Sequence, residues 1–299
     1  MIKVQVVMSS YNGEKYIKEQ LDSILIQKNI KVELLIRDDG STDRTIEILQ
    51  EYERKWDSIQ VIYGKHIGVI ESFFTLIEQV SMEQEYIAFS DQDDIWLPEK
   101  LIRAIQKIKL GQPIVYCSAK QLVNAKLQPL PSGISYKTVK TEFGNALVEN
   151  MCTGCTCVIN KEMMQLLKGK KPQFTIMHDF WIYLVGTCFG TVIYDKKSYI
   201  LYRQHESNTL GVASSLLENY KRRIKNFRKN RGKLTKQAEE LLRIYEELMT
   251  EKNKNLLGQF IQSKQKISLR KKLLVEGSIF RQRMSDDWIM KLFLLLGLL

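Results

Sequence analysis

The chain has 299 residues, of which 44% are hydrophobic and 26% charged, enough for one large globular domain with an appendage. Its five cysteines are an odd number and its first residues turn polar too soon for a signal peptide, which favours a reducing, cytoplasmic setting without a disulfide framework. The sequence has no run of about 18 apolar residues, which argues against a full transmembrane helix.

The net charge of +11 is unevenly distributed. Residues 1–213 hold 25 Lys and Arg and 25 Asp and Glu, whereas residues 214–299 hold 20 and 9. We therefore predict two parts with different partners: a balanced domain over residues 1–213 and a basic helical region over residues 214–299.

Short apolar segments alternate with segments of helical periodicity up to residue 89. The predicted strands are 3–8, 32–36, 59–63 and 86–89, and the predicted helices are 16–25, 43–52 and 69–80. Strands joined by connections of helix length predict an α/β fold, with a parallel sheet covered by helices on both faces. In such sheets the functional loops leave the carboxyl ends of the strands.

Three of these strand ends carry distinctive polar residues. The first strand is followed by Ser9–Gly13, the second by Asp38–Asp43 and the fourth by Asp91–Asp94. If the first, second and fourth strands are neighbours in the sheet, all three loops face one crevice.

The loop after the fourth strand places three carboxylates, Asp91, Asp93 and Asp94, within four residues. Oxygen ligands packed this tightly repel one another unless a cation lies among them, and Mg²⁺ or Mn²⁺ fits because both also bind phosphate oxygens. The alternative is that Asp93 or Asp94 caps a helix running through Pro98–Leu101. Capping needs one carboxylate, not three.

Together, the runs 9–12, 38–43 and 91–94 resemble the successive signatures of glycosyltransferase family 2. The resemblance covers residues 3 to about 205, and three motifs in order are more specific than any one. It implies the GT-A fold, a Rossmann-like, mostly parallel α/β sheet flanked by helices. It also implies metal-dependent, inverting transfer from a nucleotide sugar. Residues 90–101 and 202–205 are similar to the rhamnosyltransferase-like branch, which builds cell-surface polysaccharides.

The resemblance assigns donor-binding roles to five residues. Tyr11 would lie beside the nucleoside base, with Ser9 as the adjacent strand-end contact; the alternative is that Tyr11 only packs the first turn. Asp39 would accept a hydrogen bond from N3 of uracil or thymine, which favours a UDP- or dTDP-sugar because cytosine has no N3–H. Asp91 would contact ribose or metal-bound water, and Gly154 would let the donor sugar approach.

The same resemblance implies a metal site and a base. Asp93, with Asp91 as its partner, would coordinate Mg²⁺ or Mn²⁺ bridging the diphosphate. His205 would be a third ligand or a diphosphate contact, although a lone histidine is also often a plain surface or core residue. Asp179 would be the general base that takes the proton from the acceptor hydroxyl as it attacks C1. Asp179 is also a candidate N-cap for a helix over residues 180–185, and the two roles are compatible.

Other residues near these motifs have simpler interpretations. Asp94 fits a cap or a support, and Asp43 fits the cap of the second helix. The cysteines at 152, 155 and 157 make a weak zinc signal, because no second pair accompanies them, and their alternation favours a strand with buried thiols. Arg203 is expected to contact phosphate or to balance Asp93.

The basic region ends in an apolar segment. Tyr220–Lys233 is densely cationic with interleaved Ile and Phe, and Trp288–Leu296 is mainly apolar. Basic amphipathic helices of this kind favour docking on an anionic membrane surface, at the inner face of the plasma membrane, which suits a lipid-linked saccharide acceptor. A solvated helix face and nucleic-acid binding are the alternatives; we expect no nucleic-acid partner.

Two other functions remain open from the sequence. A nucleotidyltransferase on a similar sheet typically has a Gly-rich loop with a basic residue after the first strand, and Ser9–Gly13 lacks that residue. A non-catalytic nucleic-acid-binding protein would depend on the basic region alone.

Overall fold

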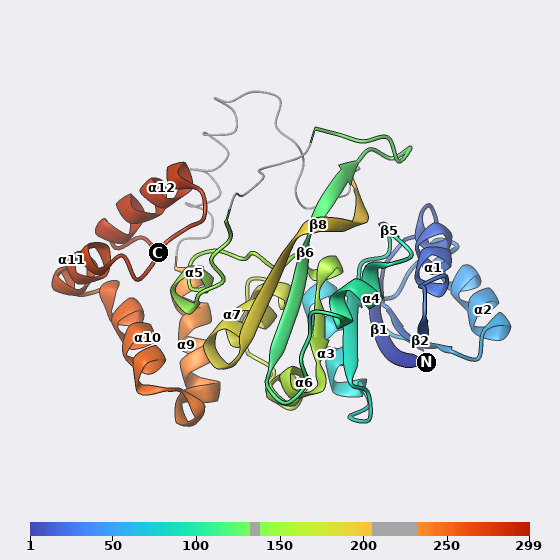
Figure 1. Ribbon diagram of the computed structural model, residues 1–299, viewed down its shortest axis with the longest axis horizontal. Helices are drawn as coiled ribbons and strands as arrows, with labels where there is room; N and C mark the ends of the chain where they lie inside the picture. Colours follow the sequence, from blue (N-terminus) through green and yellow to red (C-terminus); the bar gives the residue numbers. More distant parts are fainter. Residues whose placement is uncertain (132–137, 205–231) are drawn as a thin grey trace. The chain divides into compact units, whose positions relative to one another are not determined.

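The computed structural model describes residues 1–131, 138–204 and 232–299. It divides into two compact units (Figure 1). The first comprises Met1–Ser135, Cys152–Lys171 and Gly190–His205, and the second comprises Tyr136–Met151, Pro172–Phe189 and Glu206–Leu299. The predicted boundary at residue 213 falls outside the described residues and stays a prediction.

The first unit is built on an eight-stranded sheet with the order β3-β2-β1-β4-β7-β6-β8-β5. Pairing is parallel between β1 and β2, β1 and β4, β2 and β3, and β6 and β8, and antiparallel where β7 or β5 pairs with a neighbour. This confirms the predicted α/β class. The strands are β1 (Ile2–Ser10), β2 (Ile30–Asp38), β3 (Ile59–Tyr63), β4 (Tyr86–Ser90), β5 (Ile95–Trp96), β6 (Ile114–Val123), β7 (Val158–Asn160) and β8 (Thr191–Arg203).

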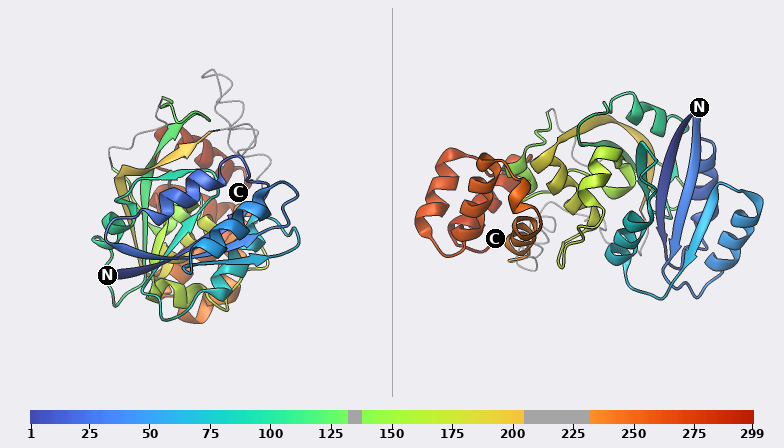
Figure 2. Two further views of the ribbon diagram at one scale, coloured as in Figure 1. Left: turned by 90° about the vertical axis from the view of Figure 1, so that its right-hand side faces the viewer. Right: turned by 90° about the horizontal axis from the view of Figure 1, so that it is seen from below.

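Helices lie on both faces of this sheet (Figure 2). Val4, Val6 and Met8 alternate along β1 and are buried in one core with Leu21 of α1. On α3, Phe73 packs against Phe89 of β4, with ring centroids 6.1 Å apart. The helices are α1 (Ile17–Leu25), α2 (Thr45–Lys55), α3 (Val69–Gln79), α4 (Lys100–Ile105) and α6 (Lys161–Leu167).

The structure excludes the alternative of a capping carboxylate in the acidic loop and corrects one expected strand. Helix α4 begins at Lys100 after Glu99, so neither Asp93 nor Asp94 caps it. The expected strand with alternating thiols is instead a short 3₁₀ helix, η1 (Gly154–Thr156), followed by the three-residue strand β7, because backbone bonds close tight turns there. The thiols are nevertheless buried, as expected: all five cysteines are buried and none forms a disulfide.

The second unit is helical. Trp181 and Phe189 of α7 pack against Tyr245 of α9, with ring centroids 6.3 Å and 5.1 Å apart. Helix α9 ends at Tyr245, and Leu248 on the following 3₁₀ turn is 54% exposed. None of the helices described here is long and apolar enough to span a bilayer. They are α5 (Phe143–Ala146), α7 (His178–Phe189), α9 (Lys233–Tyr245), η2 (Glu246–Leu248), α10 (Glu251–Ser263), α11 (Ile267–Glu276) and α12 (Met284–Leu295).

Candidate active site

The three polar loops leave one edge of the sheet, because β2, β1 and β4 are adjacent and parallel. The register pairs Ser10 with Asp38 and Met8 with Ser90, so the three strands end almost level. The first, second and fourth strands are therefore neighbours, which was the condition for the three loops to lie together.

Hydrogen bonds tie these loops to one another. The Tyr11 backbone N–H donates to Gln92 Oε1 at 2.8 Å, and Gln92 Nε2 donates to the Tyr11 carbonyl at 3.0 Å. Asn12 N–H donates to Ser41 Oγ at 2.9 Å, and Thr42 N–H donates to Asn12 Oδ1 at 2.8 Å. The first loop is thus held on one side by the acidic loop and on the other by the loop after β2.

Asp38 and Asp43 both make hydrogen bonds within the loop after β2. Asp38 accepts hydrogen bonds from the backbone and hydroxyl of Ser41 and from Ser10 Oγ, which closes the turn after β2. The expectation that Asp43 caps α2 is wrong, because the residue at the N-cap is Arg44. Asp43 lies one residue earlier and accepts a hydrogen bond from the Thr45 backbone N–H at 3.0 Å.

Asp39 is buried, and its carboxylate is bound on both oxygens. Arg37 Nη1 and the Ile67 N–H donate to Oδ1 at 2.5 Å and 2.8 Å, and the Gly68 N–H donates to Oδ2 at 2.8 Å. Burial alone would raise the pKa of Asp39, but these hydrogen bonds and the Arg37 charge outweigh it and lower the pKa. Asp39 is therefore an ionised acceptor that also anchors the loop of residues 65–68.

Sequence reasoning missed two partners of this loop. His66, which had no motif around it, places Nδ1 3.0 Å from Asp39 Oδ2, and its ring centroid lies 4.3 Å from that of Tyr11. Arg37 has a side chain only 5% exposed and also donates to the Lys65 carbonyl at 2.9 Å. A Cβ on Gly64 would lie 2.5 Å from Arg37 Nη2, so a larger residue there would have to displace the guanidinium. The one available signal for Arg37 was a charge inside an apolar strand.

Ser9 and Tyr11 point to different surroundings. Ser9 Oγ donates to Ser72 Oγ of α3 at 2.7 Å. Tyr11 is 42% exposed, which is a large open fraction for an aromatic side chain next to His66. Part of the Tyr11 side chain is therefore open to solvent, and its contact with a nucleoside base stays a prediction.

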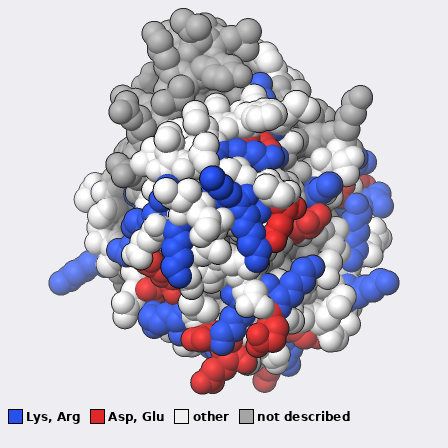
Figure 3. Space-filling view, turned by 90° about the vertical axis from the view of Figure 1, so that its left-hand side faces the viewer, with Lys and Arg blue, Asp and Glu red and all other residues white. Residues whose placement is uncertain are grey.

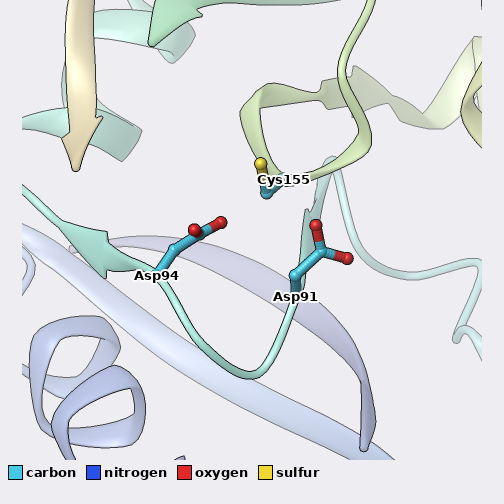
Figure 4. A group of neighbouring side chains, drawn as sticks. All are labelled: Asp91, Asp94 and Cys155. Atoms are coloured by element: carbon cyan, nitrogen blue, oxygen red, sulfur yellow. The ribbon is translucent and has the colours of Figure 1, made fainter. Parts of the chain in front are cut away.

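The acidic loop separates its three carboxylates by depth. Asp91 and Asp93 are half-buried, whereas Asp94 is fully buried. Ligand atoms of Asp91, Asp94 and Cys155 lie within 4.8 Å of one another, and Figure 4 shows these side chains converging. Among the described residues this is the one group of three or more acidic, Cys or His side chains close enough to share a cation, and Asp93 is not part of it.

The chemistry of this group limits what it can hold. Burial first, and then the charges of Asp91 and Asp93, raise the pKa of Asp94 well above its usual value. Burial likewise raises the pKa of the Cys155 thiol, and a neutral thiol is a poor ligand for Mg²⁺ or Mn²⁺. Within this group, the half-buried Asp91 is the oxygen donor that suits a hard cation, and Asp93 on the same loop is also half-buried.

Asp94 and Arg203 hold the acidic loop through hydrogen bonds to strand β8. The Arg203 backbone N–H donates to Asp94 Oδ1 at 3.1 Å, and its Nε donates to the Asp93 carbonyl at 2.8 Å. The Arg203 guanidinium also forms an ion pair with Glu19 at 2.5 Å. Its expected contact with phosphate or with the Asp93 carboxylate stays a prediction. Asp94 is the support that the sequence allowed, not a cap.

Lys100 is a further residue near the acidic loop that sequence reasoning missed. It is 1% exposed, and its Nζ lies 3.5 Å from the centroid of the Trp96 ring. Burial lowers the pKa of Lys100 to about 8, against smaller opposing effects from Cys155, Cys157 and Asp94. No sequence pattern distinguished this lysine from one at the exposed start of a helix.

The remaining predicted residues lie elsewhere or outside the described chain. Gly154 is buried and begins η1 in the sheet unit. Asp179 belongs to the second unit, where α7 begins at His178, so Asp179 lies inside the first helical turn rather than at the cap. Burial lowers the pKa of the adjacent His178, although Asp179 opposes the effect. His205 and most of Tyr220–Lys233 lie outside the described residues.

A family match and a curated relative both connect this chain with glycosyltransferases. Residues 5–167 match the family described as glycosyl transferase family 2. The chain is 35% identical over 232 residues to the dTDP-rhamnosyl transferase RfbG of Shigella flexneri, covering 72% of this chain and 77% of that one.

Solved structures share the fold. The S. aureus TarS fragment 1–349 in complex with UDP-GlcNAc has a TM-score of 0.60 at 20% identity, covering 88% of this chain and 72% of that one. The mannosyltransferase PcManGT from Pyrobaculum calidifontis, in complex with GDP-Man and Mn²⁺, has a TM-score of 0.53 at 14% identity, covering 98% and 85%. These likenesses establish the GT-A fold.

Proposed function

Because this chain belongs to glycosyl transferase family 2, we propose that it transfers a sugar from a UDP- or dTDP-sugar to a saccharide acceptor. The reaction is an inverting single displacement assisted by Mg²⁺ or Mn²⁺, in the synthesis of a cell-surface polysaccharide. The observation that carries the proposal is the hydrogen-bonded meeting of the three loops at one sheet edge, where Tyr11, Asp39 and Asp91 come from three neighbouring strand ends.

The donor base is proposed to lie against Tyr11. An exposed aromatic face suits a flat base. Asp39 stands on the adjacent strand end as an ionised acceptor, which is the state required to accept N3–H from uracil or thymine. The similarity to a dTDP-rhamnosyl transferase supports dTDP-rhamnose as a donor to test alongside UDP-sugars.

The diphosphate is proposed to be held by a cation on Asp93 and Asp91. When bound, Mg²⁺ or Mn²⁺ neutralises charge on the departing nucleoside diphosphate. Two half-buried carboxylates on one short loop supply oxygen ligands, and Arg203 fixes the loop through the Asp93 carbonyl. A structural relative with GDP-Man and Mn²⁺ supports trying Mn²⁺ first. His205 remains the proposed third ligand, and Gly154 the proposed neighbour of the donor sugar.

The acceptor is proposed to be activated by Asp179. Its carboxylate takes the proton from the acceptor hydroxyl as that oxygen forms the new bond to C1, while the bond from C1 to the nucleoside diphosphate breaks. A single base is enough because an inverting displacement has no covalent enzyme intermediate. The acceptor is proposed to be lipid-linked, with the enzyme working at an anionic membrane surface on the cytoplasmic side.

The decisive experiment is a donor screen that measures nucleoside diphosphate release. Purified protein is incubated with dTDP- and UDP-sugars, with Mg²⁺, with Mn²⁺ and with EDTA, in the presence of lipid-linked saccharide acceptors. We expect release with at least one thymidine or uridine donor and its loss in EDTA. Release from none of these donors would contradict the proposal, and undiminished release in EDTA would remove the metal from it.

A further inference from the structure

Helix α12 is apolar on two opposite faces. Met290, Phe293 and Leu294 are buried against the second unit. The other face carries a continuous row that we call the α12 stripe: Met284, Trp288, Leu292 and Leu295, exposed by 77%, 68%, 54% and 45%. These residues are spaced four, four and three apart, so they line one side of the helix.

An exposed row of this size is unusual in a water-facing helix. A surface helix normally carries charged or polar residues opposite its buried face, whereas a helix that is apolar on both sides is normally covered on both. Large exposed apolar patches mark contacts with a protein, a ligand or a membrane. The α12 stripe therefore requires an occupant.

The charges around the stripe favour a lipid surface. Residues 264–291 hold eight Lys and Arg and three Asp and Glu. Lys271 and Lys272 are exposed on α11, which packs against α12. Lys291 stands beside the stripe on α12 itself, with Nζ 6.0 Å from the Trp288 ring centroid. On the face of the molecule that bears these helices, Lys and Arg side chains lie among uncharged surface, with fewer acidic ones between them (Figure 3).

Helix α12 is too short to cross a bilayer, so on a membrane it would lie in the plane of the surface. With 12 residues, α12 is about 18 Å long, well short of the roughly 30 Å needed to cross the hydrocarbon core. Trp is the side chain most at home at the boundary between headgroups and acyl chains, and Lys can extend from there to anionic headgroups.

We infer that α12 docks flat on an anionic lipid bilayer, with Met284, Trp288, Leu292 and Leu295 inserted at the headgroup boundary and neighbouring lysines on the lipid phosphates. This inference rests on the proposed function only in that it names the surface where that function takes place; the stripe itself is independent of the donor site.

The test is vesicle co-sedimentation of the full chain. The probes are phosphatidylcholine vesicles and the same vesicles with about 30% phosphatidylglycerol. The variant is Trp288→Gln with Leu292→Gln. The matched control is Trp56→Gln with Ile26→Gln, which removes an exposed Trp and an exposed aliphatic residue, 40% and 60% exposed, from the sheet unit. All four side chains are exposed, so thermal unfolding and lipid-free donor hydrolysis should match those of the wild type.

We expect the wild type and the control to bind the anionic vesicles, more weakly at high salt, and the α12 variant to bind about tenfold less or worse. Three results would overturn the inference: no binding of the wild type to anionic vesicles, equal binding of the α12 variant, or a wild-type dimer that the α12 variant dissociates without any vesicle binding. Vesicle binding without any donor turnover would refute the proposed function and leave the docking surface standing.

Discussion

The Gln92 side-chain amide forms a two-way hydrogen-bonded pair with the Tyr11 backbone, at 2.8 Å and 3.0 Å, although the residues are 81 positions apart. The pair joins the loop after β1 to the acidic loop after β4. A Cβ on Gly13 would collide with Gln92 Oε1, so the pair also depends on a glycine two residues along the chain. The position of the Tyr11 backbone and the position of the acidic loop therefore depend on each other.

This geometry predicts that Gly13 and Gln92 are energetically coupled. Gln92→Ala should weaken binding of UDP or dTDP in the presence of Mn²⁺ by about 1 kcal/mol, since it removes a hydrogen-bonded brace. Gly13→Ala should do the same by displacing Gln92, and the double variant should be no worse than Gln92→Ala alone. Calorimetric titration measures all three. Gly258→Ala, in α10 with open space around it, is the control and should be neutral; strictly additive losses would argue against the coupling.

Asp93→Asn should remove metal-dependent nucleotide binding. Replacing a charged ligand by an amide is expected to lower Mn²⁺-dependent affinity by more than about tenfold. Asp94→Asn should have a smaller effect, because the raised pKa of Asp94 favours a neutral carboxyl that an amide mimics in shape. Titration of Mn²⁺ into the protein with nucleotide measures both, with the exposed Asp57→Asn as control. If Asp94→Asn were the more damaging, the cation would belong with Asp91, Asp94 and Cys155.

Asp179→Asn should separate binding from transfer. We expect transfer to fall by about 10³-fold, since the amide cannot accept the acceptor proton, while nucleotide binding stays unchanged. Asp286→Asn is a matched control because it removes another carboxylate from the first turn of a helix, α12, in the same unit. The comparison is between donor affinity and acceptor turnover in each variant. Parallel loss of both quantities in Asp179→Asn would refute its assignment as the base.

Lys100→Met should stabilise the protein at neutral pH. The pKa of Lys100 falls from 10.5 to about 8 on folding, which corresponds to a cost of about 3 kcal/mol while the unfolded and folded amines are both protonated. The folded-state pKa is depressed, so the unfolded state binds more protons between pH 8 and 10.5, and this lysine makes the wild type relatively more stable as pH rises through that window. Methionine keeps the volume and removes the charge, for an expected gain of about 1–3 kcal/mol at pH 7.

Urea unfolding at pH 7 and at about pH 9.5 checks this prediction. The difference between the wild type and Lys100→Met should shrink at the higher pH, whereas the exposed Lys28→Met control should show almost no difference at either. A loss of stability in Lys100→Met at pH 7 would mean that the buried ammonium is held by a stronger partner than the Trp96 ring.

Much of the sheet can be predicted because its signals are local. The apolar runs predict strand β3 at its observed bounds, and β1, β2 and β4 within two residues at each end, since short apolar runs separated by helical periodicity leave little choice. The second half of the sheet is harder. Strand β7 has three residues and lies between β4 and β6, and a cysteine alternation that looks like a strand is a 3₁₀ turn. Such short elements are decided by what packs around them.

The residues of the candidate site also divide into those with a local sequence signal and those recognised only from contacts in the fold. Tyr11, Asp39 and Asp91 stand out because turn residues and carboxylates directly after apolar strands are typical of the ligand-binding edge of a parallel sheet. His66 and Arg37 do not stand out in the sequence, because what marks them is their contact with Asp39 in the folded loop. Asp39 is 27 positions from His66 and 2 positions from Arg37. Arg203 braces the Asp93 carbonyl from 110 positions away, a contact that no local pattern contains.

The sequence by itself determined the order of strands and helices up to β4, the family, and the three loops that carry its signatures, because these follow from residue types and spacings along the chain. Only the tertiary structure decided how the carboxylates of the acidic loop divide. Burial in the fold and the charges of Asp91 and Asp93 raise the cost of a charge on Asp94, against hydrogen bonds from the Arg203 backbone and from Cys155. Asp91 and Asp93 themselves are only half-buried. The same holds for α12, whose second apolar face is recognised as exposed only when the first is seen to be buried.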